Sequence, residues 1–137
     1  MNFPKYFTLS EVLKTSQPFR NFPTDWEQVH NLLFCTLALD VVRDRFGHPL
    51  RVNSGFRTRE VNRAVGGVAT SQHLLGCAFD VRPVDVTLLD DFNFVCKGFV
   101  ERKETVEGLG IDQLIIYPTF VHIGWSRNPR WQVITKK

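Results

Sequence analysis

The chain has 137 residues, of which 43% are hydrophobic and 23% charged, and its formal net charge is +3 at pH 7. This length fits a single globular domain over residues 1–137, with enough chain to bury a core and too little for two domains. The small positive charge could favour an anionic partner, although ordinary surface balance explains it as well. No basic cluster with exposed aromatic residues suggests nucleic acid, no stretch approaches the ~20 apolar residues of a membrane span, and a monomer is expected.

The N-terminal segment and the cysteines bear on where the chain is made. Met1–Tyr6 has neither the apolar core nor the small-residue cleavage site of a signal peptide. We therefore expect synthesis in the cytoplasm, with delivery by another route if the substrate lies outside the membrane. The three cysteines, Cys35, Cys77 and Cys96, are an odd number without close pairing, so we expect no disulfide framework and a reducing compartment.

Two long helices are predicted from a capping signal and from apolar periodicity. Thr24 followed by Glu27 forms a capping box, and the apolar residues after it predict a helix over residues 25–46. Apolar residues at helical period predict a second helix over residues 85–102.

Strands are predicted in the intervals around and after these helices. Apolar and β-branched runs place them near residues 50–54, 77–82, 112–117 and 120–125, the last two forming a hairpin. A further short strand is an option over residues 131–134. The expected fold class is therefore α+β, an antiparallel sheet with both long helices packed on one face.

A histidine and an aspartate seven residues apart, His73 and Asp80, lie in a stretch of otherwise apolar or small residues. A loop holding His73, a turn at Gly76 and a following strand would bring both side chains to the same side. An imidazole nitrogen and a carboxylate oxygen suit a divalent ion, zinc first. His122 is the natural third ligand because it too lies in an apolar, strand-like run.

Three ordered motifs carry a resemblance to a known family. The pattern Ser-x-His-x-x-Gly-x-Ala-x-Asp over residues 71–80 resembles the zinc motif of the D-alanyl-D-alanine carboxypeptidase family, which shares its fold with the hedgehog signalling domain and with phage L-alanyl-D-glutamate endopeptidases. Asn-Ser-Gly-Phe-Arg-Thr at 53–58 is similar to the family's Ser-Gly-Tyr-Arg element. Asp-Gln-Leu-Ile at 112–115 and Val-His-Ile at 121–123 resemble the hairpin that carries the last ligand. The likeness spans nearly the whole chain and is nearest to short forms carried by bacteria and their phages.

The resemblance implies a fold, a cofactor and a substrate. The fold would be hedgehog/DD-peptidase-like, and His73, Asp80 and His122 would hold one zinc ion, leaving a fourth position for the water that attacks the peptide bond. Arg57 matches an arginine that family members use near the substrate carbonyl or carboxylate. Ser71 and Gln113 are further candidate substrate contacts.

The general acid/base of the family is not evident in this sequence. Family enzymes place an acidic residue a few positions before the last histidine, but Ile116, Tyr117 and Thr119 occupy the positions that could align with it. Strand alternation predicts that Asp112 faces away from Tyr117, and Glu60 could assist only if its turn folds toward the metal. Tyr117, whose hydroxyl could donate a hydrogen bond to a developing oxyanion, is therefore the remaining catalytic candidate beside the arginine.

Two hypotheses of different class follow. The first is a zinc peptidase that cuts peptidoglycan stem peptides or cross-bridges, either as a D-Ala-D-Ala carboxypeptidase-like enzyme or as an endopeptidase. The second is a non-catalytic, zinc-stabilised binding or structural domain that keeps the fold and the metal but lacks the base. Release of amino acid or peptide from purified peptidoglycan distinguishes the two.

Overall fold

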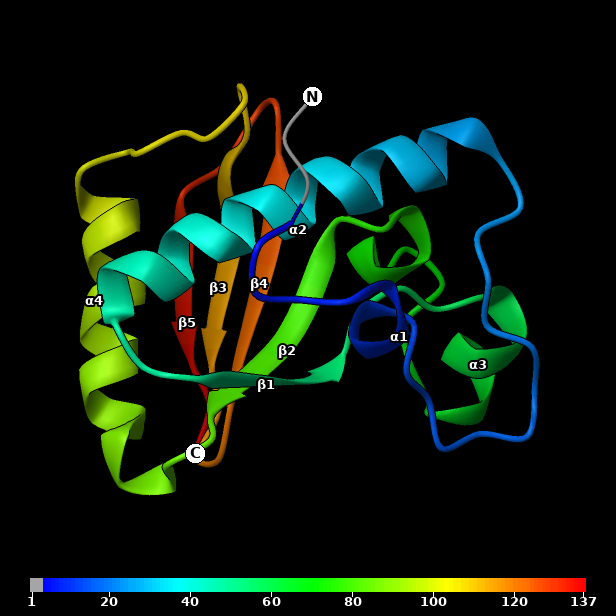
Figure 1. Ribbon diagram of the computed structural model, residues 1–137, viewed down its shortest axis with the longest axis horizontal. Helices are drawn as coiled ribbons and strands as arrows, with labels where there is room; N and C mark the ends of the chain where they lie inside the picture. The colour runs from blue at the N-terminus through cyan, green and yellow to red at the C-terminus, as the bar shows by residue number, and fades with distance from the viewer. Residues whose placement is uncertain (1–3) are drawn as a thin grey trace.

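The computed structural model describes residues 4–137 (Figure 1). Residues 1–3, which begin the segment in which no signal peptide was expected, lie outside the described residues. The fold is α+β, as predicted, with helices packed on a five-stranded sheet of order β1-β2-β4-β3-β5. No helix within the described range is long and apolar enough to cross a membrane.

The long helix α2 (Trp26–Phe46) begins after Asp25, whose side chain accepts a hydrogen bond from the backbone N–H of Gln28. The predicted capping box of Thr24 and Glu27 is therefore wrong by one residue. Thr24 instead donates its backbone N–H to the Gln28 side-chain oxygen at 2.9 Å. Both Thr and Asp are good caps, so sequence spacing alone did not separate them.

The second long helix is shorter than predicted. Asp85 accepts hydrogen bonds from the backbone and side chain of Thr87, which closes a short 3₁₀ turn, η2 (Val86–Leu88). The α-helix α4 (Leu89–Glu101) starts only after this turn. Residues 4–137 also form three short helices: α1 (Leu9–Val12), α3 (Arg59–Ala64) and the 3₁₀ helix η1 (Gln72–Leu75).

Four strands lie where the sequence placed them: β1 (Leu50–Ser54), β2 (Ala78–Pro83), β3 (Gly110–Ile116) and β4 (Val121–Ser126). These four pair antiparallel. The fifth strand, β5 (Gln132–Thr135), corresponds to the optional strand near the C-terminus, and it pairs parallel to β3 at the sheet edge.

The hydrophobic core lies between the sheet and the helices α2 and α4, which cover the same face of it (Figure 1). Alternate residues of the central strands point into this core and are almost completely buried, among them Phe79, Val81, Leu114, Val121 and Ile123. The residues between them point to the opposite face. The helices thus fix the sheet from one side and leave the other side for polar groups.

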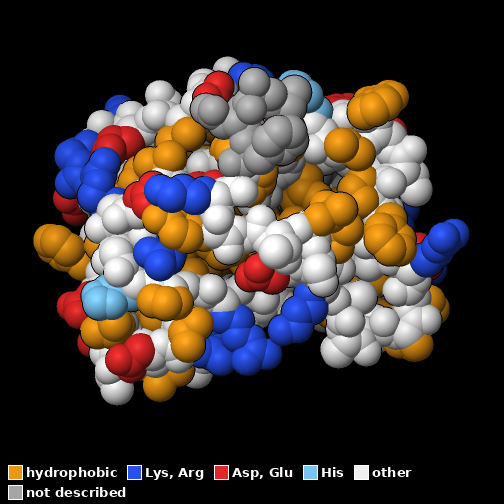
Figure 2. All heavy atoms as spheres, in the orientation of Figure 1, with side chains coloured by type: hydrophobic (Ala, Val, Ile, Leu, Met, Phe, Trp, Pro, Cys, Tyr) orange, Lys and Arg blue, Asp and Glu red, His pale blue; other side chains and the backbone are white. Residues whose placement is uncertain are grey.

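An apolar groove of about 430 Å³ lies between α1 and the N-terminal half of α2. Figure 2 shows hydrophobic side chains gathered on this side of the molecule. Leu9, Phe22 and Val29 line the groove and are 65%, 56% and 42% exposed. The groove contains none of the residues predicted to bind metal.

Candidate metal centre

The structure brings His73, Asp80 and His122 together from three separate elements. Asp80 on β2 and His122 on β4 are directly paired across the antiparallel ladder, and His73 comes from η1. Asp80 Oδ1 lies 2.9 Å from His122 Nδ1 and 3.2 Å from His73 Nε2. One potential ligand atom from each residue lies within 4.8 Å of the other two. A single metal ion could contact all three.

The short helix η1 is held in place at both of its ends. Ser71 accepts the backbone N–H of His73 at 3.2 Å, so its hydroxyl caps the helix. Gly76 ends the helix at φ +77°, a left-handed conformation that glycine adopts without strain. A Cβ there would also lie 2.9 Å from the backbone oxygen of Gln28 on α2. The position of His73 therefore depends on a close approach between η1 and α2.

The tautomer of His73 indicates that its inward nitrogen is suited to a metal. His73 Nδ1 lies 2.6 Å from the carbonyl oxygen of Gly55, and because a carbonyl can only accept, Nδ1 carries the proton. In a neutral ring the lone pair is then on Nε2. Without a metal ion, Nε2 can hydrogen-bond Asp80 Oδ1 at 3.2 Å only when it carries a second proton, and a divalent ion between the two atoms would take the place of that proton. The donor set, two imidazoles and one carboxylate, fits a divalent ion of the zinc type.

The Asp80 carboxylate is the central group of the cluster. Its burial raises the pKa, but hydrogen bonds to His122 and His73 outweigh this effect and hold the pKa of Asp80 well below its usual range. Asp80 is therefore an anion across the neutral range. Its second oxygen, Oδ2, lies 3.3 Å from an Nη atom of Arg57.

Arg57 follows strand β1, and its side chain reaches the metal cluster. Its Nε donates to the Ser54 hydroxyl at 3.0 Å, and one Nη donates to the Asn62 side-chain oxygen at 3.3 Å. Its backbone N–H donates to the carbonyl of His73 at 3.0 Å. Arg57 thus pairs with Asp80, whereas Glu60 lies exposed on α3.

A cleft of about 680 Å³ opens over the cluster, and the predicted substrate contacts line it. Ser71, Gln113 and Tyr117 are all on its wall. The Tyr117 ring stacks on Phe120 with centroids 4.5 Å apart, which fixes the ring plane at the cleft edge. Glu60 is absent from the cleft wall.

Asp112 also lines this cleft, so the prediction that it faces away from Tyr117 is wrong. The reason is a β-bulge: Ile111 pairs with Trp125 and Gln113 with Gly124, which leaves Asp112 as an extra residue. A bulge interrupts the alternation of side chains. The carboxylate is not free, since Arg130 donates to it through its backbone N–H at 2.8 Å and through Nη2 at 2.9 Å.

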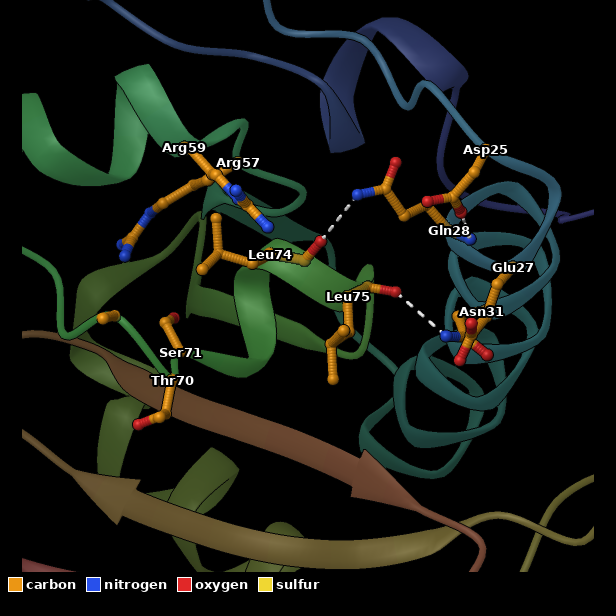
Figure 3. A pocket seen from close by; sticks show the side chains of 11 residues that line it. Asp25, Glu27, Gln28, Asn31, Arg57, Arg59, Thr70, Ser71, Leu74 and Leu75 are labelled. Atoms are coloured by element: carbon orange, nitrogen blue, oxygen red, sulfur yellow. Dashed lines mark hydrogen bonds between the residues drawn. The ribbon is translucent and has the colours of Figure 1, made fainter.

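A second hollow of about 480 Å³ adjoins the cleft on the side of α2 (Figure 3). Arg57, Thr70 and Ser71 line both hollows. In the second hollow, Gln28 donates to the backbone oxygen of Leu74 at 3.2 Å, and Asn31 donates to that of Leu75 at 3.1 Å (Figure 3). These bonds tie η1 to α2.

Several residues that shape the site were not singled out as site residues from the sequence. Gly55 orients His73 through a backbone carbonyl, and Ser54 and Asn62 hold Arg57. Their place beside the arginine motif was the available signal. Arg130 and Lys136 also line the cleft, and no sequence pattern linked this C-terminal segment to a histidine motif far upstream.

Comparison with known proteins agrees with this geometry. The sequence matches the family model described as Peptidase M15 over residues 5–123. A search of curated proteins found no match. The match covers most of the chain, and the chain therefore belongs to the peptidase M15 family, whose members are zinc-dependent metallopeptidases. Its α+β fold is consistent with that of the family.

Proposed function

We propose that the protein is a zinc-dependent peptidase that hydrolyses the stem peptides or cross-bridges of peptidoglycan. The observation that carries this proposal is the triad of His73, Asp80 and His122 at the floor of an open cleft, in a chain of a peptidase family. A structural metal site is usually closed by four protein ligands, whereas a catalytic one keeps a position for water or substrate. Three ligands facing a cleft favour the catalytic type.

Zinc would be held by His73 Nε2, His122 Nδ1 and a carboxylate oxygen of Asp80. When bound, zinc polarises a substrate carbonyl and lowers the pKa of a coordinated water toward ~7. The chain's own groups would do the rest. Gly55 fixes the His73 tautomer, and the Arg57 guanidinium, held by Ser54, presents positive charge beside the cluster.

Tyr117 and Arg57 are the groups suited to the substrate carbonyl. Both line the cleft together with the metal cluster. The Tyr117 phenol could donate its O–H, and the Arg57 guanidinium an N–H, to the developing oxyanion. A donor that already points to this oxygen stabilises it without reorganisation at the moment of reaction. Ser71 and Gln113, also on the cleft wall, would hold the peptide in register.

A non-catalytic, zinc-stabilised binding domain is the second candidate, and one observation favours it. Two carboxylates line the cleft, and both are engaged: Asp80 with the two histidines and Arg57, and Asp112 with Arg130. A positioned general base contributes ~10²–10⁴-fold in rate. A peptidase that lacks a free carboxylate at this place would be slow.

Localisation and origin belong to the same proposal. The substrate would lie outside the membrane, and the chain would be synthesised in the cytoplasm and reach it by a separate delivery step. The protein would be one of the short peptidases, encoded by bacteria or their phages, that act on the cell wall. The protein would act as a monomer.

The test is digestion of purified peptidoglycan by the zinc-loaded full chain, with products identified by mass spectrometry. We expect slow release of free amino acid or peptide, abolished in His122→Ala. Release of terminal D-alanine would indicate a carboxypeptidase, and release of internal peptides an endopeptidase. Absence of any product from the wild type, together with retained zinc and specific peptide binding, would favour the binding domain.

A further inference from the structure

Strand β5 and the residues around it extend the cleft beyond the part of the chain that matches the family model. That match ends at residue 123, directly after His122. The chain then completes β4, turns, and returns as β5 alongside β3 in parallel. This C-terminal segment, residues 127–136, contributes Arg130, Ile134 and Lys136 to the wall of the metal cleft.

The segment is anchored firmly enough to form a defined wall. Arg130 bonds Asp112 through both its backbone and its side chain. The Trp131 ring covers Gly110 so closely that a Cβ on residue 110 would lie 2.4 Å from a ring carbon. After β5, the Lys136 backbone N–H donates to the carbonyl of Ile116 at 2.8 Å. Contacts just before β5 therefore hold Arg130 in place, and a contact just after β5 holds Lys136.

The charges in the cleft do not balance. Arg57, Arg130 and Lys136 are its cationic side chains, and Asp80 and Asp112 are its carboxylates. Arg57 pairs with Asp80 and Arg130 with Asp112. Lys136 takes part in none of the ion pairs found among residues 4–137. The cleft therefore presents one unmatched ammonium group, to which a bound divalent ion would add further positive charge.

Arg130 has donor capacity left as well. Asp112 uses its Nε and Nη2 atoms, and among the described residues no hydrogen bond is made by Nη1. The Arg130 side chain is 60% exposed, in contrast to 9% for Asp112. A guanidinium can hold one carboxylate and still donate to a second one from its free edge.

We propose that Lys136, assisted by Arg130, forms a subsite for a carboxylate of the peptide substrate, next to the metal-binding residues. This inference rests on the proposed peptidase function and specifies its substrate class: an acidic peptide whose free carboxylate lies on the β5 side of the reacting bond. Ile134, which lines the same cleft, offers apolar contact to the peptide. The subsite makes β5 a determinant of specificity in addition to its role as an edge strand.

The test compares Lys136→Gln with Lys137→Gln in the zinc-loaded full chain. Lys137 is the matched control because it is an exposed lysine next in sequence that does not line the cleft. Three probes are used: a peptidoglycan stem pentapeptide with its glutamyl α-carboxylate and C-terminal carboxylate both free, and two versions with one or the other amidated. For Lys136→Gln we expect KM for the first peptide to rise about two- to fivefold, the range of an exposed ion pair, with kcat unchanged.

The outcome on the amidated peptides decides the inference. The effect of Lys136→Gln should vanish with one of them, which identifies the carboxylate that is recognised. An equal effect on all three peptides, or an equal effect of Lys137→Gln, would overturn the proposal. If no peptide is hydrolysed, the proposed activity fails, and the same peptides are titrated by calorimetry. A dissociation constant that depends on Lys136 and on one carboxylate would then support the subsite independently, and one that does not would refute it.

Discussion

The Nδ1 atom of His73 lies 2.6 Å from the carbonyl oxygen of Gly55. This contact helps to connect the turn after β1 to the metal cluster, and it sets which nitrogen of His73 is available to a metal. Hydrogen bonds of this kind orient metal-binding imidazoles in many proteins. The backbone at residue 55 is therefore part of the site although glycine has no side chain.

A substitution of Gly55 should damage both the fold and the site. In Gly55→Ala the new Cβ would lie 2.3 Å from the backbone oxygen of Val12, and backbone atoms must move to relieve the clash. We expect a loss of about 1–3 kcal/mol in unfolding free energy, measured by urea denaturation, and weaker zinc binding. Gly98→Ala on α4 is the control, because its new Cβ meets only the movable end of Arg102. Equal stability of the two variants would contradict this account of the turn.

Arg57 should matter for rate more than for metal content. In Arg57→Ala the cleft loses a charge beside the cluster, and we expect hydrolysis to fall about 10²–10³-fold, the usual effect of removing one oxyanion donor. Arg57→Lys should rescue little, since lysine cannot bond Ser54 and Asp80 in the planar arrangement seen here. Zinc content should stay near that of the wild type. Arg63→Ala, an exposed position on α3, serves as the control and should be fully active.

Variants of Tyr117 test whether its hydroxyl assists catalysis in place of the family's acidic residue, which this chain lacks near His122. Tyr117→Phe removes the hydroxyl but keeps the stacking on Phe120, so we expect unchanged thermal stability and at least a tenfold lower kcat. Tyr117→Glu and Thr119→Asp would each restore a carboxylate near the cleft, and one of them should raise the rate above that of the wild type. Full activity in Tyr117→Phe with a bell-shaped pH profile would show that another acid serves as the base, with Asp112→Asn the next variant to assay.

The ion pair of Asp112 with Arg130 should contribute to the pH dependence of the unfolding free energy at acid pH. Burial raises the pKa of Asp112, but its hydrogen bonds to Arg130 outweigh burial, and the pKa in the folded state lies below its usual value. Stability from this pair is then fully present above the unfolded-state pKa of ~3.9 and is lost as pH falls through the folded-state pKa. We expect the unfolding free energy of metal-free Asp112→Asn to depend less on pH below ~4 than that of the metal-free wild type. Parallel pH profiles would argue against the pair.

The success and failure of the sequence predictions have physical causes. Strands β2 and β4 could be predicted because apolar and polar residues alternate along them, and two of the polar residues in this alternation, Asp80 and His122, face the cleft. Asp112 was misplaced because a β-bulge leaves no local signature in the sequence and reverses the face of the residue it adds.

The C-terminal wall of the cleft was beyond sequence reasoning for a different reason. The short run after residue 131 gave a hint of a strand, but its partner and direction depend on pairing with β3 far from it in chain order. Only that pairing brings Arg130 next to Asp112 and Lys136 into the cleft. Long-range contacts between charged side chains have no periodicity that a single sequence could reveal.

The most direct test of the account is the metal content of the histidine variants. The purified wild type should contain one zinc per chain, and His73→Ala and His122→Ala should contain none. His30→Ala, an exposed histidine on α2, is the matched control and should keep its zinc. Chelation should lower the melting temperature of the wild type and of His30→Ala, because metal bound only to the folded state stabilises it, and should leave the two other variants unchanged. Full zinc occupancy in both His73→Ala and His122→Ala, measured by plasma mass spectrometry, would contradict the central claim.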